Sequence, residues 1–223
     1  MAAVIDVDGT LIDSNYQHVL AWQRAFAAAG FHVPCARIHR TIGIGSDRFV
    51  AAACDEAAER EHGDALRDAH SEQYEKLIDE AGPLPDAHEL LAALRERDVA
   101  VVLASSATRE ELDCYVEQLD AAELIQAAVS AGDVDTTKPA PDVIQTALGQ
   151  IDADEAIMIG DSRWDCEAAG RAGVPPVGVL TGGWSRGELR EAGAVEVFED
   201  LGAICSHLGE VLGHARHPRP DAA

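Results

Sequence analysis

Apolar segments and helical segments alternate along most of the chain, and this pattern predicts the fold. Short apolar runs bounded by Gly, Pro or polar residues are typical of buried strands. We expect strands at residues 3–8, 99–104, 127–131, 155–160, 177–180 and 195–198. Helices are predicted at residues 86–97, 109–119, 141–149, 164–172 and 200–212. This alternation indicates an α/β fold, here a Rossmann-like three-layer α/β/α sandwich with a mainly parallel sheet.

After the first strand, a long helical stretch rich in Ala, Arg and Glu interrupts the alternation. Val19, Trp22 and Phe26 recur there at helical spacing. Proline and glycine at residues 82–85, and Asp13-Ser14 on the other side, provide the expected hinges. We therefore expect two domains, a catalytic core at 1–14 and 83–223 and an inserted helical cap at 15–82.

Polar side chains occur at four places where an apolar strand or a proline-stiffened loop ends. The segments are Asp6-Val7-Asp8-Gly9-Thr10, Ser105-Ser106, Thr137-Lys138-Pro139 and Gly160-Asp161-Ser162-Arg163-Trp164-Asp165. Taken singly, each has an ordinary structural explanation as a turn, a helix cap, a surface lysine or a helix N-terminus. In an open parallel sheet, however, the carboxyl ends of the strands converge on one crevice. Together the four segments predict a single site, where clustered carboxylates require a cation or a phosphorylated substrate.

In this order, the four segments resemble the four signatures of the haloacid dehalogenase superfamily, in its phosphatase and β-phosphoglucomutase-like branch. The resemblance implies phosphoryl transfer through an aspartyl phosphate. Asp6 would be the nucleophile, and Asp8 would protonate the leaving oxygen and later activate water. Lys138 would balance the charge between Asp6 and the phosphoryl group.

The resemblance also implies a Mg²⁺ site and a phosphate site. Mg²⁺ would bind Asp6, the backbone carbonyl of Asp8, and Asp161, with Asp165 supporting the ion through its water shell. Phosphate oxygens would be held by Lys138 and by the side chains or backbone amides of Gly9, Thr10, Ser105 and Ser106.

Asp8 argues against a true dehalogenase, because a leaving halide needs no proton.

Two features of the cap bear on the choice between a mutase and a hydrolase, and they favour different answers. His18 and Trp22 lie one helical turn apart, and similar sugar phosphate mutases carry a His-x-x-x-Trp in which the His couples cap closure to the acid. A core tryptophan beside a boundary histidine explains the same pair. Mutases also carry a phosphate-binding Arg where this chain has Ser46, and Arg48 or Arg40 is the candidate substitute.

We therefore expect a phosphoric monoester hydrolase, a Mg²⁺-dependent phosphatase acting on a small phosphorylated metabolite of the phosphoglycolate or sugar phosphate type. A phosphohexomutase is the alternative enzyme. A receiver-like signalling module without turnover is the alternative from another class, although receivers are shorter and have no cap.

Composition limits the partners and the compartment. The formal charge of −23, from 40 acidic and 17 basic residues, excludes nucleic acid and anionic membranes as expected partners. No 18-residue apolar stretch occurs, and the five cysteines follow no metal or disulfide spacing. We expect a cytoplasmic monomer or homodimer with reduced thiols.

Overall fold

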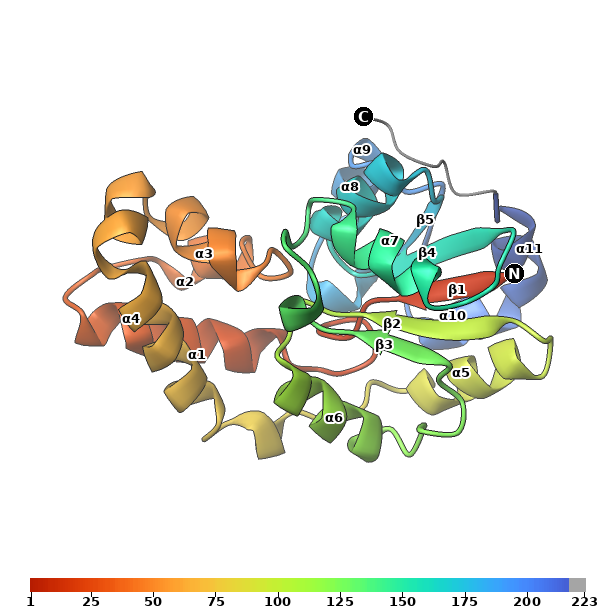
Figure 1. Cartoon of the computed structure of the whole chain (residues 1–223), viewed down its shortest axis with the longest axis horizontal. Helices are drawn as coiled ribbons and strands as arrows, with labels where there is room; N and C mark the ends of the chain where they lie inside the picture. Colours follow the sequence, from red (N-terminus) through yellow and green to blue (C-terminus); the bar gives the residue numbers. More distant parts are fainter. Residues whose placement is uncertain (217–223) are drawn as a thin grey trace.

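The computed structural model describes residues 1–216, which contain one six-stranded parallel sheet with the strand order β3-β2-β1-β4-β5-β6 (Figure 1). Residues 217–223, at the end of the predicted core, lie outside the described part of the chain. The strands are β1 (Ala2–Ile5), β2 (Ala100–Ala104), β3 (Ala127–Val129), β4 (Ala156–Gly160), β5 (Pro176–Val179) and β6 (Glu196–Phe198). The predicted fold class is confirmed. The first strand ends at Ile5, earlier than expected, so the acidic residues that follow it lie in a loop.

The central strands are apolar throughout because both faces of the sheet are covered, as is usual for parallel sheets. In β1, Ala3 and Ile5 contribute to one hydrophobic cluster, whereas Ala2 and Val4 contribute to another on the opposite face. All four of these side chains are fully buried. The period of two along the strand therefore sets the two cores of the sandwich.

Helices form a layer on each face of the sheet (Figure 1). One face carries α5 (Ala87–Arg95), α6 (Arg109–Gln118), α10 (Leu201–Ser206) and α11 (Leu208–Gly213). The other carries α7 (Asp142–Gly149) and α8 (Arg163–Ala172), with α9 (Arg186–Glu191) packed beside α8. Short 3₁₀ turns lie at Ile78–Glu80, Ala131–Asp133 and Leu180–Gly182.

The single helix predicted at residues 200–212 is wrong, because the chain breaks at His207 into α10 and α11. His207 has φ −115° and ψ 20°, outside the helical region, and its ring Nδ1 lies 2.9 Å from the carbonyl oxygen of Ala203. The break allows Leu208 and Val211 to join the same buried cluster as α10.

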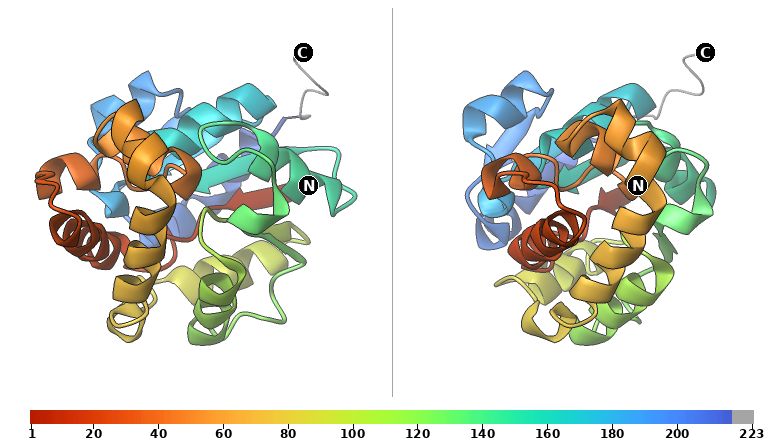
Figure 2. Two further views of the ribbon diagram at one scale, coloured as in Figure 1. Left: turned by 60° about the vertical axis from the view of Figure 1, so that its left-hand side comes forward. Right: turned by 90° about the vertical axis from the view of Figure 1, so that its left-hand side faces the viewer.

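Four helices between β1 and α5 form a separate layer beyond the sheet, and we call them the cap helices. They are α1 (Asn15–Ala28), α2 (Cys35–His39), α3 (Ser46–Ala53) and α4 (Glu56–Tyr74). Their own apolar cluster includes Trp22, Phe26, Phe49 and Leu66. The cap helices lie in front of the carboxyl ends of the central strands (Figures 1 and 2). The domain boundaries inferred from the sequence stay a prediction.

Within residues 1–216, no helix combines the length and apolarity needed to cross a membrane. All five cysteines are free thiols, and Cys166 is buried.

Candidate active site

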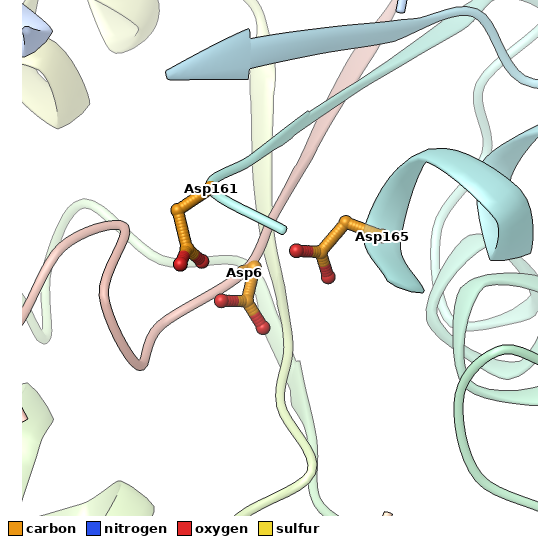
Figure 3. Close-up of side chains that lie close together, drawn as sticks. All are labelled: Asp6, Asp161 and Asp165. Carbon is orange, nitrogen blue, oxygen red and sulfur yellow. The ribbon is translucent and has the colours of Figure 1, made fainter. Parts of the chain in front are cut away.

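Three aspartates meet at the carboxyl edge of the sheet (Figure 3). Asp6 follows β1 and Asp161 follows β4, and these neighbouring strands are in register, with Ile5 opposite Ile159. Asp165 comes from the first turn of α8. Each of the three offers a carboxylate oxygen within 4.8 Å of the others, and all three residues are buried. The parallel register thus brings together side chains that are about 155 positions apart in the sequence.

Lys138 is the cation of this cluster. Its side chain is fully buried; its ammonium group pairs with Asp6 and lies 2.8 Å from a carboxylate oxygen of Asp165. Thr10 donates a hydrogen bond to Asp161 at 3.0 Å, and Asn15 donates another at 3.1 Å. Three carboxylates against one ammonium group leave two negative charges uncompensated.

The charge imbalance is visible in the pKa values. Burial and the neighbouring Asp165 raise the pKa of Asp6 to about 7, although Lys138 acts in the opposite direction. Burial, with Asp6 and Asp165 next, raises the pKa of Asp161 well above its usual range. Burial opposes the charge on Lys138, but Asp165 and Asp6 outweigh it and raise the pKa of the lysine. These directions indicate a site that attracts a further positive charge. Its oxygen-rich donor set fits a hard metal ion.

Two glycines make the close approach of these loops possible. Gly9 has φ +79°, a left-handed conformation that glycine adopts without strain. A Cβ added at Gly182 would lie 1.6 Å from a carboxylate oxygen of Asp161. The loop after β5 therefore packs against the acidic cluster only because it carries no side chain at this position.

Asp8 is not part of the three-aspartate cluster and has different partners. Its Oδ1 accepts a hydrogen bond from Ser14 at 2.6 Å and lies 3.2 Å from Nε2 of His18. Its Oδ2 has only a long contact, 3.4 Å from the hydroxyl of Ser105. Burial acts to raise the pKa of Asp8, but the hydrogen bonds from His18 and Ser14 hold it below its usual value. Oδ1 is therefore held by two partners, while Oδ2 is held more weakly, by the long contact with Ser105.

A cavity of about 120 Å³ separates the core from the cap helices. Asp6, Asp8 and Ser106 line it from the core, and Trp22 and His70 are among the residues lining it from the cap. The Ser106 hydroxyl is buried and has no hydrogen-bond partner in the described part of the chain. An unpartnered buried hydroxyl beside two carboxylates is a donor placed to bind a ligand.

Not every predicted site residue reaches this cavity. The residues that do not line it are Gly9, Thr10, Ser105, Lys138, Asp161 and Asp165. Of these, Thr10 and Lys138 contact Asp6, which does line it. Arg48 is not among the lining residues; its side chain is 48% exposed and lies 3.9 Å from Asp47. His18 does line the cavity.

Sequence reasoning missed two residues of α4, His70 and Tyr74. Nε2 of His70 lies 3.2 Å from Nδ1 of His18, and the Tyr74 ring stacks on the His18 ring with centroids 3.7 Å apart. The signal was available, because His70-x-x-x-Tyr74 repeats the one-turn spacing of His18-x-x-x-Trp22. Asp8 raises the pKa of His18 against the effect of burial, whereas burial and the charge on His18 hold that of His70 well below its usual value.

Comparison with known proteins identifies the family. The family model for haloacid dehalogenase-like hydrolases matches residues 3–179. The chain belongs to this family. A protein from Rhodospirillum rubrum named phosphoglycolate phosphatase is 28% identical, over 93% of this chain and 90% of its own length. A Streptomyces hygroscopicus protein named validoxylamine A 7′-phosphate phosphatase is 30% identical, over 80% of this chain and 85% of its own.

A solved structure agrees with this family assignment. A hydrolase from Pseudomonas syringae superposes with a TM-score of 0.88 and is 34% identical, covering 95% of this chain and 99% of that protein. The resemblance predicted from the four polar segments is therefore confirmed.

Proposed function

We propose that this hydrolase is a Mg²⁺-dependent phosphatase that acts on a small phosphorylated metabolite through an aspartyl phosphate at Asp6. The observation that carries the proposal is the placement of two carboxylates on one cavity. Asp6 belongs to the acidic cluster with Lys138, and Asp8 lies outside that cluster with one weakly held oxygen. A nucleophile and a separate proton donor are the two groups that this chemistry needs.

Asp6 and Asp161 would hold Mg²⁺ together with the backbone carbonyl of Asp8, with Asp165 in support. Asp165 is itself held by Lys138 at 2.8 Å and by Ser162 at 2.6 Å. When bound, the ion would offset the surplus negative charge and polarise the phosphoryl oxygens.

The reaction proceeds in two displacements at phosphorus. A carboxylate oxygen of Asp6 attacks the phosphorus atom and the bond to the leaving oxygen breaks. Asp8, whose pKa is lowered in the free protein, must take up a proton in the substrate complex, and it then gives this proton to the leaving oxygen. Asp8 then takes a proton from water, whose oxygen attacks the phosphorus, and phosphate leaves Asp6 as a free carboxylate. Lys138 keeps Asp6 oriented, and Ser106 donates a hydrogen bond to a phosphoryl oxygen.

The names of the relatives support phosphoglycolate and a phosphorylated sugar-like compound as substrate types. A phosphohexomutase is disfavoured, because a sugar bisphosphate needs a second anion site. Arg48 is not among the cavity-lining residues. Arg67 lines it, but its guanidinium group is 2.9 Å from Glu59 and 2.8 Å from Asp64. We therefore propose a hydrolase that needs no bisphosphate primer.

A panel of phosphorylated metabolites with released phosphate as the readout tests this proposal. With Mg²⁺, the purified protein should release phosphate from at least one small monophosphate, and Asp6→Asn should not. Strict dependence on a sugar bisphosphate together with isomerised hexose phosphate would show a mutase. A phosphoryl group retained without turnover would show a signalling module.

A further inference from the structure

His70 on α4 is connected to Asp8 through His18 on α1. Nε2 of His18 lies 3.2 Å from Asp8 Oδ1, and Nδ1 of the same ring lies 3.2 Å from His70 Nε2. The connection therefore runs from the catalytic loop through two different cap helices. Both imidazole rings line the cavity between cap and core.

The ionisation of Asp8 in the free protein determines which ring nitrogens donate and which accept. An ionised carboxylate only accepts, so Nε2 of His18 carries a proton. If His18 is charged, its Nδ1 donates to His70 Nε2; if it is neutral, Nδ1 accepts from that atom. The contact is a hydrogen bond in either protonation state. His70 is therefore the partner that satisfies the second nitrogen of His18.

Aromatic stacking fixes both rings in this arrangement. His18 lies parallel to Tyr74, with an interplanar angle of 7°. His70 stacks on Trp22 with centroids 4.2 Å apart and an angle of 20°. Trp22 also stacks on Phe49, with ring centroids 4.1 Å apart. Rotation of either ring out of the hydrogen bond would break these contacts.

The orientation of the second oxygen of Asp8, Oδ2, depends on the hydrogen bond from His18 to Oδ1. Oδ1 is held by Ser14 and His18, and this leaves Oδ2 as the oxygen available to the leaving group. If His18 turns away, Oδ1 keeps only the Ser14 hydrogen bond and Oδ2 only the long Ser105 contact, so the direction of Oδ2 is less well defined. Displacements of about 1 Å in such groups reduce rates strongly.

We propose that His70 is a positioning residue for the acid and base steps: by holding His18 on Asp8, it makes the orientation of Oδ2 depend on the packing of α4 over the site. The proposal rests on the phosphatase function given above. His70 itself transfers no proton.

The experiment compares two substitutions of His70 with a matched control on the same helix. His70→Phe keeps an aromatic ring against Trp22 but removes both nitrogens, whereas His70→Gln keeps a polar group that can reach His18. His62→Phe is the control, because His62 lies on α4 with a side chain that is 47% exposed. Thermal unfolding checks that all variants fold.

The readout is kcat/KM for two leaving groups. An alkoxide needs a proton as it departs, whereas p-nitrophenolate is a stable anion that needs little help. His70→Phe should lower kcat/KM about tenfold for an alkyl phosphate from the panel and less than about twofold for p-nitrophenyl phosphate, within the range expected for acid catalysis. His70→Gln should recover most of the loss, and His62→Phe should match wild type.

Equal losses for both substrates, or no loss in His70→Phe, would overturn the proposal. A second readout needs no turnover: in the metal-free protein, the ¹⁵N resonance of His18 Nδ1 should shift in His70→Phe and stay near wild type in His70→Gln. An unchanged resonance in His70→Phe would also overturn it. If wild type turns over neither substrate, the phosphatase function fails instead, and the resonance still tests the contact.

Discussion

Asp161→Asn should stabilise the metal-free protein although it damages the metal site. Asp161 is buried beside two other carboxylates with only Lys138 as a cation. The new amide can be accommodated. Its oxygen can still accept from Thr10, which now donates to Asp161 at 3.0 Å. Asn15 has a buried Oδ1 without a partner in the described part of the chain, so a flip of its amide offers an acceptor to the new NH₂ group.

The magnitude follows from electrostatics and from proton uptake. Two unit charges 4.8 Å apart, the outer distance within the cluster, repel by about 3.5 kcal/mol at an effective dielectric constant of 20. Asp161 can avoid this repulsion by taking up a proton, and this limits the cost. Keeping a carboxyl group with the usual aspartate pKa of 3.8 protonated at pH 7 costs about 4 kcal/mol at most. Allowing for the burial of an amide, we expect a gain of about 2 kcal/mol. For a chain of this size, that raises Tm by roughly 4–8 °C.

The pH dependence provides the sharper test. Because the pKa of Asp161 is raised in the folded state, folding takes up a proton, and stability falls as pH rises from the unfolded pKa towards the folded one. The Tm advantage of Asp161→Asn should therefore be small near the usual aspartate pKa of 3.8 and should grow as the pH rises towards the raised pKa of the folded state.

Calorimetry in EDTA measures the effect, with the exposed Asp113→Asn on α6 as a control that changes stability by less than about 0.5 kcal/mol. Added Mg²⁺ should stabilise wild type much more than Asp161→Asn. A variant that melts below wild type, or an advantage that grows towards low pH, would refute the reasoning.

Two further outcomes are expected. EDTA should abolish phosphate release and Mg²⁺ should restore it, because the acidic cluster lacks a second cation; full activity in chelator would contradict the metal site. Ser106→Ala should weaken competitive inhibition by inorganic phosphate by about tenfold to a hundredfold, since one hydrogen bond to a charged group is lost. Unchanged inhibition would show that the Ser106 hydroxyl does not contact phosphate.

The sequence predicts the contacts of the core domain better than those of the cap helices. The acidic cluster is predictable because the parallel register alone places Asp6 next to Asp161 at the same edge of the sheet. The break at His207 is not predictable from periodicity, because Leu208 and Val211 keep apolar spacing on both sides of it.

The cap contacts depend on how helices distant in sequence cross. The repeated spacing of His and an aromatic residue marks both helices, but no local pattern shows that His18 meets His70, because the two residues are 52 positions apart. The position of Arg48 outside the cavity likewise follows from the orientation of α3, with Phe49 turned into the cap core and Arg48 towards solvent.

The most direct test of the central claim is to trap the phosphoenzyme. Rapid acid quench of the Mg²⁺-loaded protein with a substrate labelled in its phosphoryl group, followed by peptide mapping, should place the label on Asp6 within the turnover time. Asp6→Asn should carry none. A label on any other residue, or rapid turnover of wild type without label on the chain, would contradict nucleophilic catalysis by Asp6.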